Sequence, residues 1–304
     1  MAERLHLYDT TLRDGAQTQG VDFSIEEKRQ IALALDALGI EYIEGGWPGA
    51  NPTDDGFFAA PPPLRRAKLA AFGMTRRSGR SAANDPGLQP LFQARVPVIT
   101  LVGKTWSRHV TEALGVETDE NLAMITDSLA AAGAHAGEVM FDAEHFFDGY
   151  KADPAYARAC LEAALAGGAA WLVLCDTNGG TLPHEVERIV GEVAAALPRA
   201  RLGIHTHDDA GCAVANSLAA VRAGARQIQG TLNGLGERCG NANLVTLLPS
   251  LVLKEGWDCG IDPATLEELT PIARRFDEIL ARTPNPSAAY VGRNAFAHKG
   301  GLHA

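Results

Sequence analysis

Short apolar runs alternate along this chain with longer stretches in which apolar residues recur at helical spacing. The short runs predict eight strands, at Leu5–Tyr8, Glu41–Glu44, Lys68–Met74, Val96–Val102, Glu138–Phe141, Trp171–Cys175, Arg201–His205 and Arg226–Gly230. Helical periodicity separates most of them, at Ser24–Leu38, Asp119–Gly133, Pro154–Ala166, Pro183–Leu197, Cys212–Ala223 and Ala242–Lys254. The second and third helices of this series are weak, because Pro52 and the run from Pro61 to Pro63 interrupt them. Strands that alternate with helices predict a parallel sheet, and eight strands can close into a barrel.

The residues at the strand ends favour a closed barrel over an open doubly wound sheet. Nearly every predicted strand is followed by polar or reactive groups, namely Arg13 and Asp14, Glu44, Thr75 and Arg76, Lys104, Asp142 and Glu144, Asp176 and Thr177, His205 and His207, and Asn233. A barrel gathers these ends at one point, whereas an open sheet scatters the outer ones. We therefore predict an α/β fold, a (β/α)8 TIM barrel over residues 1–256. Residues 257–304 form a short extension, with a helix around Pro263–Ala281 and a turn-rich linker.

Composition and charge narrow the function classes. The 304 residues include 46% hydrophobic and 21% charged residues, and the formal net charge is −10, so a face that binds nucleic acid is not expected. The five cysteines are far apart and form no CxxC pair, which excludes a zinc ribbon and a disulfide framework. The N-terminus lacks an apolar signal core, and no apolar run has the length of a membrane span. We expect a cytoplasmic protein with no membrane partner.

The segment GIHTHDDAG predicts a metal site at the end of the seventh strand. Residues i and i+2 of a strand point to the same face, so His205 and His207 both project into the barrel mouth. Asp14, after the first strand, supplies a carboxylate nearby, because only the eighth strand separates the first from the seventh in a closed barrel. Such ligands suit Zn, Mn, Co or Fe, and suit Mg less well. The alternative is a pair of buried histidines hydrogen-bonded to their neighbours.

Two further segments allow two interpretations each. Arg13, in DTTLRDGAQ, offers a planar charged fork beside the metal for a carboxylate or oxyanion, or else forms an exposed loop salt bridge. The Gly-rich segment GTLNGLGERCGNANL follows the eighth strand, where barrels commonly bind phosphate. Backbone strain alone also explains its glycines, and Asn241 or Asn243 could cap the following helix.

Several of these motifs together carry a resemblance to a known family. DTTLRDGAQ, the paired histidines, GERCGNANL and HKGGLH resemble the metal-dependent acyltransferases of the 2-isopropylmalate, homocitrate and citramalate synthase family. Five more segments are similar to its (R)-citramalate synthase branch, namely EGGWPGANPTD, GKTW, HVTEALG, FDAEHFFDGYKA and LCDTNGGTLP. The likeness runs from about Leu7 to the last residue. It implies a condensation of acetyl-CoA with a small 2-oxo acid, here pyruvate, in a homodimer.

The resemblance also assigns roles to individual residues. It makes Asp14, His205, His207 and Asn241 the ligands of one divalent metal, with Mn, Zn, Co and Mg as candidates. Arg13 would lie over the keto oxygen, Thr177 would hold the carboxylate, and Asp142 is grouped with them as substrate-binding. Three more residues match active-site positions, namely Glu144, Glu237 and His303, with His303 as the candidate base. In the family the segment around this histidine reaches into the partner's active site, and relatives continue into linker subdomains and a regulatory domain.

One departure from the family pattern bears on the substrate. Relatives read HxHND where this chain has Asp208 after His207, so an extra carboxylate is expected near the metal. It could alter metal preference or repel an anionic substrate side chain. The alternatives are the same chemistry on another 2-oxo acid, a metal-dependent lyase or aldolase on this fold, and a metal-binding barrel without turnover.

Overall fold

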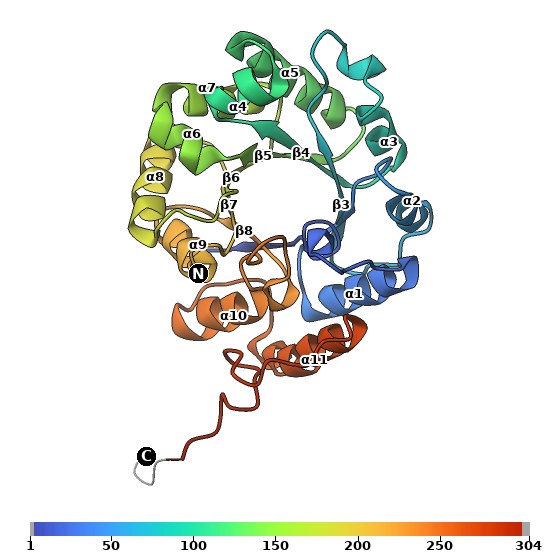
Figure 1. The fold of residues 1–304 in the computed structure, drawn as a ribbon, viewed down its shortest axis with the longest axis vertical. Coiled ribbons are helices and arrows are strands. Elements are labelled where there is room, and N and C mark those ends of the chain that lie inside the picture. Colours follow the sequence, from blue (N-terminus) through green and yellow to red (C-terminus); the bar gives the residue numbers. More distant parts are fainter. Residues whose placement is uncertain (1–2, 300–304) are drawn as a thin grey trace.

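The computed structural model describes residues 3–299 and shows a closed parallel barrel surrounded by helices (Figure 1). Its strands are β1 (His6–Asp9), β2 (Tyr42–Gly46), β3 (Lys68–Met74), β4 (Val98–Lys104), β5 (Glu138–Glu144), β6 (Trp171–Asp176), β7 (Leu202–Thr206) and β8 (Gln227–Gly230). Each strand pairs in parallel with the next, and β8 pairs with β1, for example Leu7 with Ile228. This closure confirms the TIM barrel and excludes an open sheet.

The helices follow the strands in the predicted alternation. They are α1 (Ile25–Leu38), α2 (Pro52–Ala59), α3 (Leu88–Gln93), α4 (Ser107–His109), α5 (Thr118–Gly133), α6 (Phe146–Ala152), α7 (Pro154–Ala166), α8 (Pro183–Ala196), α9 (Ala213–Arg222), α10 (Leu244–Pro249) and α11 (Leu269–Ile279). The Ser24 and Glu27 side chains form a capping box at the start of α1, where the helical pattern begins. Pro52 was expected to interrupt a helix but instead begins α2, since a first-turn proline lacks only an N–H that has no helical partner.

Side chains fill the barrel interior and a second apolar layer lies outside it. The interior cluster consists of Tyr8, Tyr42, Ala70, Val98, Met140, Trp171, Val173 and Cys175. The larger core lies between the strands and the helices, and it includes outward-facing strand residues such as Leu101 and Phe141. Because both faces of the parallel strands are buried, most of the strands are rich in apolar residues on both faces. The interior residues support the polar groups at the C-terminal ends of the strands.

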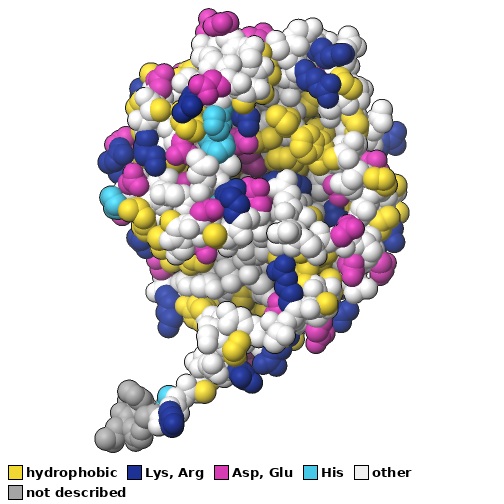
Figure 2. Space-filling model, viewed as in Figure 1, with side chains coloured by type: hydrophobic (Ala, Val, Ile, Leu, Met, Phe, Trp, Pro, Cys, Tyr) yellow, Lys and Arg dark blue, Asp and Glu magenta, His cyan; other side chains and the backbone are white. Residues whose placement is uncertain are grey.

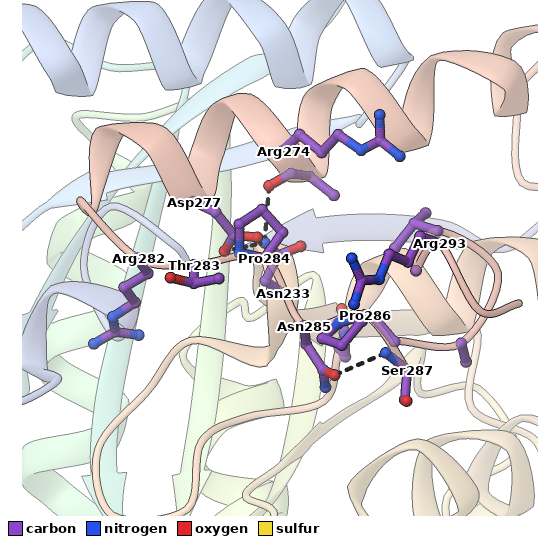
Figure 3. Close-up of a pocket in the computed structure, with 16 residues that line it drawn as sticks. Asn233, Arg274, Asp277, Arg282, Thr283, Pro284, Asn285, Pro286, Ser287 and Arg293 are labelled. Carbon is purple, nitrogen blue, oxygen red and sulfur yellow. Dashed lines mark hydrogen bonds between the residues drawn. The ribbon is translucent and has the colours of Figure 1, made fainter.

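The chain beyond the barrel packs against its side. The helix predicted around Pro263–Ala281 is a 3-10 turn at Pro263–Glu268 followed by α11, which contacts α1. Residues beyond α11 form turns and then lead away from the barrel in Figure 1. A cavity of about 710 Å³ lies between α11 and this segment, and Figure 3 shows Asn233 and Asp277 on its wall. No helix within residues 3–299 has the length and apolar character that crossing a membrane requires.

Candidate metal centre and active site

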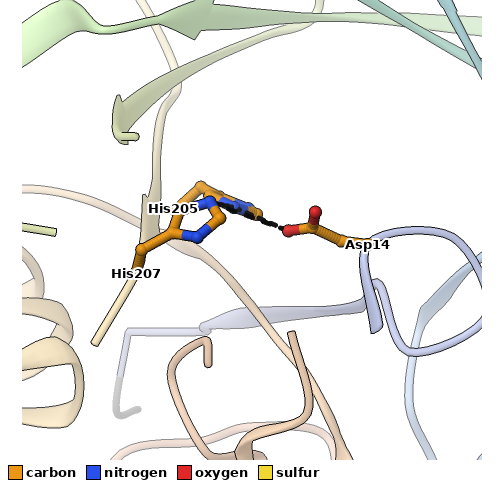
Figure 4. A group of neighbouring side chains, drawn as sticks. All are labelled: Asp14, His205 and His207. Atoms are coloured by element: carbon orange, nitrogen blue, oxygen red, sulfur yellow. Dashed lines mark hydrogen bonds and ion pairs between the residues drawn. The ribbon is translucent and has the colours of Figure 1, made fainter. Parts of the chain in front are cut away.

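Three buried side chains meet at the mouth of the barrel, as Figure 4 shows. His205 lies on β7, His207 follows that strand, and Asp14 follows β1. The Nε2 atoms of the two histidines are 3.2 Å apart, and Asp14 Oδ2 lies 3.1 Å from His205 Nε2 and 3.8 Å from His207 Nε2. The structure therefore brings together the three residues that the strand pattern selected.

The hydrogen bonds around His205 test whether this group suits a metal. Gln229 donates its amide Nε2 to Asp142 Oδ1 at 3.1 Å, so its Oε1 accepts from His205 Nδ1 at 2.8 Å. A neutral His205 with its proton on Nδ1 turns the Nε2 lone pair toward the Asp14 carboxylate. A divalent cation could take the place of the proton that His205 Nε2 shares with Asp14, and a second partner on the outer nitrogen is typical of metal-bound histidine. The residues present thus fit a metal.

The charges in this group respond to burial and to one another. Burial lowers the pKa of His207 to about 3, and the neighbouring His205 contributes to the lowering. Burial also lowers the pKa of His205, but the hydrogen bond and charge of Asp14 outweigh it and leave that pKa raised. For Asp14, burial raises the pKa, yet Arg13 and the histidines hold it well below its usual range. The carboxylate is therefore an anion with two nitrogen ligands beside it.

Asn241 lies behind Asp14 with its side-chain amide in contact with the metal group. Its Nδ2 donates to Asp14 Oδ2, while its Oδ1 is buried with no hydrogen-bond partner among the described residues. Rotation of the amide about its Cβ–Cγ bond exchanges these atoms and offers the oxygen to a metal. Asn243 has the other role that the sequence allowed, because its side chain accepts from Val245 N and caps α10.

Arg13 lies in the site and not in an exposed loop. Its Nε donates to Glu44 Oε2 at 2.6 Å and its Nη1 to Asp14 Oδ1 at 3.1 Å. The guanidinium carbon lies 3.9 Å from the centre of the Phe72 ring. The remaining N–H groups of the fork are available to a ligand, because Arg13 lines the central cavity. Between its two interpretations, the geometry supports the functional one.

A cavity of about 270 Å³ connects these groups with the other predicted residues. Eight of the predicted site residues line it, namely Arg13, Asp14, Asp142, Glu144, Thr177, His205, His207 and Glu237. On the face shown in Figure 2, acidic and basic side chains gather around a central hollow beside hydrophobic ones. His303 lies outside the described residues.

The acidic and hydroxyl groups of the cavity have distinct partners. Glu144 pairs with Lys104, and Glu237 pairs with Arg238. Thr177 Oγ1 accepts from the backbone N–H of His145 at 2.8 Å, which leaves its hydroxyl proton free to point elsewhere. Burial and the charge of Glu44 raise the pKa of Asp142 to about 7. With this raised pKa, Asp142 can carry a proton near neutral pH.

The apolar wall of the cavity and the position of Asp208 complete the description of the site. Phe72, Met74 and Val102 are among the side chains that line the cavity. Leu101 and Phe141 point outward into the helix-facing core. The Asp208 carboxylate accepts from Ala213 N at 2.8 Å at the start of α9, so it is turned away from the metal group.

Other residues of the site carried no assigned role in the sequence. Glu44 and Lys104 were noted only as polar strand ends, yet the first fixes Arg13 and the second fixes Glu144. Gln229, which orients His205, is a polar residue inside the short strand β8. Its i, i+2 spacing from Gln227 is a signal that β8 has a polar inner face.

Fold and site together define a (β/α)8 barrel with a buried candidate metal site at the C-terminal ends of its strands. The chain belongs to the HMGL-like family, whose model matches residues 4–272. It is 53% identical over 306 residues to the (R)-citramalate synthase of Aquifex aeolicus, covering 100% of this chain and 58% of that protein. It is 35% identical over 303 residues to a probable 2-isopropylmalate synthase of Methanopyrus kandleri, covering 100% of this chain and 58% of that protein.

A solved structure has the same fold as this chain. The share of the related synthases that the chain covers limits what their activity implies for it. The hydroxymethylglutaryl-CoA lyase from Pseudomonas aeruginosa superposes with a TM-score of 0.77 at 21% identity, covering 93% of this chain and 95% of that chain. At this identity the likeness shows the fold alone. The chain spans about 58% of the length of the synthases it matches, so the activity of those whole proteins is carried over below only as a proposal.

Proposed function

We propose that this chain is the catalytic barrel of an acyltransferase that condenses acetyl-CoA with pyruvate to give (R)-citramalate and CoA. The observation that carries the proposal is the buried group of Asp14, His205 and His207 with Arg13 bonded to its carboxylate. The identity to an (R)-citramalate synthase exceeds that to a probable 2-isopropylmalate synthase, 53% against 35%. This difference favours pyruvate over a bulkier 2-oxo acid.

In this proposal Asp14, His205, His207 and, after rotation of its amide, Asn241 hold one divalent metal. When bound, the metal would supply Lewis-acid polarisation of the 2-oxo acid oxygens. Mn, Zn, Co and Mg remain candidates, and the two imidazole ligands favour the transition metals. Residues 1–256 would be the catalytic domain and residues 257–304 the start of a linker.

The protein's own groups would handle the charge and the protons. Arg13 is fixed by Glu44 and Asp14 with N–H groups left over, so it can stabilise the charge that develops on the keto oxygen. Thr177 receives the His145 N–H and can donate its own proton to the substrate carboxylate, with Asp142 beside it. Glu144 would manage the new hydroxyl or the hydrolytic water. His303, oriented by Glu237, would remove the methyl proton of acetyl-CoA.

The experiment that tests the proposal is a thiol-release assay with acetyl-CoA and a panel of acceptors. Pyruvate, 2-oxobutyrate, 2-oxoisovalerate, 2-oxoglutarate and glyoxylate should be compared by kcat/KM. We expect pyruvate to be preferred, because each methylene that does not fit costs about 1–3 kcal/mol of discrimination. A higher kcat/KM with 2-oxoisovalerate or 2-oxoglutarate would assign the chain to another synthase. Metal binding without CoA release from any acceptor would favour a lyase or a barrel without turnover.

A further inference from the structure

The motif GKTW supplies a cation, Lys104, to the active site. The proposed chemistry gives this residue no role. Lys104, the last residue of β4, forms an ion pair with Glu144, the last residue of β5, and the two are register partners in the sheet. Both side chains line the cavity that contains Arg13 and the metal group. The pair is largely shielded, with 18% of the Lys104 side chain and 24% of the Glu144 side chain exposed.

The backbone around this ion pair is fixed on both strands. The Lys104 carbonyl accepts from Nδ2 of the buried Asn121 at 2.9 Å. The Glu144 carbonyl accepts from the buried Thr105 hydroxyl at 2.8 Å and from Thr105 N at 3.3 Å. These hydrogen bonds hold the C-terminal ends of β4 and β5 in place. The ion pair therefore forms between two fixed strand ends and not in a flexible loop.

The surroundings explain why Glu144 requires a counter-ion. Asp142 lies two residues earlier on β5, and Asp14 and Glu237 line the same cavity. Asp142 forms no ion pair with any residue between 3 and 299, and burial together with the charge of Glu44 raises its pKa to about 7. The Glu144 carboxylate therefore lies near other negatively charged groups. The other cation of the cavity, Arg13, already forms ion pairs with Glu44 and Asp14.

We propose that Lys104 is a positioning residue of the active site, which acts through Glu144 by holding its carboxylate in a fixed place on the cavity wall. This inference rests on the proposed function, in which Glu144 handles the new hydroxyl or the hydrolytic water. It predicts that the lysine matters only while the glutamate is present. A lysine that merely stabilised the fold, or that contacted substrate independently, would contribute whether or not Glu144 is there.

A double-mutant cycle in the thiol-release assay tests this dependence. Lys104→Met should lower kcat by roughly 10–100-fold, similar to the loss seen when the hydrogen-bond partner of a metal ligand is removed, with little change in KM for the 2-oxo acid. Lys104→Arg should restore most of kcat, because it keeps the charge. Glu144→Gln should lower kcat at least as much as Lys104→Met, and the variant with both changes should turn over no more slowly than Glu144→Gln alone.

The ion pair at the opposite end of the barrel provides a matched control. Lys68 at the start of β3 pairs with Glu138 at the start of β5 at 2.9 Å, at the opposite end of β5 from Glu144. Lys68→Met should leave kcat unchanged, and thermal unfolding of every variant checks that the barrel is intact. Losses that multiply in the double variant, or a Lys104→Met enzyme with normal kcat, would overturn the role of Lys104. Absence of CoA release by the wild-type chain would instead overturn the proposed function.

Discussion

At the scale of single residues, the metal group consists of side chains that are almost fully buried. Asp14, His205 and His207 are 2%, 5% and 4% exposed, and His207 Nδ1 has no hydrogen-bond partner among the described residues. Burying a carboxylate and two imidazoles is costly unless their charges and lone pairs are satisfied. A bound cation would satisfy them, so metal binding should be coupled to stability.

We expect a divalent transition metal to stabilise the folded protein through this group. Metal at roughly 100 times its Kd should raise the free energy of unfolding by about 2.7 kcal/mol, because it binds only the folded state. His205→Ala should abolish this increase, whereas His184→Ala, at an exposed position of α8, should retain it. The measurement is urea unfolding with and without metal, together with the bound metal content. A full increase in the His205 variant would place the metal elsewhere.

A second residue-scale prediction concerns the guanidinium fork of Arg13. Arg13→Lys keeps the charge but cannot contact Glu44, Asp14 and a ligand oxygen at once. The activation free energy for turnover should rise by about 3–4 kcal/mol, which is the loss of stabilisation seen when a partner of a developing oxyanion is removed. Turnover should fall accordingly. Steady-state kinetics and metal content should be measured together. Normal turnover would remove Arg13 from the mechanism.

At the scale of elements, a buried carboxylate of α1 holds the loop that precedes β3. Asp36, in the last turn of α1, accepts from the backbone N–H groups of Arg65, Arg66 and Ala67 at 2.9, 2.8 and 2.7 Å. These bonds hold the segment that leads into β3, which carries Phe72 beneath Arg13. Burial raises the pKa of Asp36, but the three N–H donors outweigh it and leave the pKa lowered.

The lowered pKa fixes the sign of a pH-dependent effect on stability. The ionised carboxylate stabilises the fold above its ordinary pKa, and this contribution is lost as pH falls through the lowered value in the folded state. Asp36→Asn should therefore cost about 1–3 kcal/mol at neutral pH, and the difference from wild type should shrink below about pH 4. Urea unfolding across this range measures it, with the exposed Asp22→Asn as control. A cost that did not change with pH would show that charge is not involved.

At the scale of the whole molecule, the resemblance implies a dimer in which His303 serves the partner's barrel. Mixing two inactive variants tests this arrangement. Arg13→Lys damages a subunit's own barrel, whereas His303→Ala would damage only the partner's site. After random mixing, half of the dimers contain one subunit of each variant, and one of the two sites in each mixed dimer is intact. The mixture should therefore regain about a quarter of wild-type activity. Either variant alone is the control, and a mixture no more active than they are would place His303 in its own barrel or outside the mechanism.

Much of the fold and part of the site followed from local patterns. The alternation of apolar runs with helical periodicity predicted the eight strands, because each element shows its own period wherever it lies in the fold. The i, i+2 spacing placed His205 and His207 on one face for the same reason. The capping residue Ser24 marked the start of α1. These features depend only on neighbours in the chain.

Only the tertiary structure decided the features that depend on residues distant in sequence. Closure of β8 on β1 brings Asp14 to the histidines, and strand register sets Lys104 beside Glu144. Asn241 and Asn243 both matched a helix cap, and only the folded loop turned Asn241 to Asp14. Parallel strands are apolar on both faces, so their sequence could not tell that Val102 faces the cavity while Leu101 faces the helices. Local periodicity determines which elements form, whereas the contacts between elements determine which side chains meet.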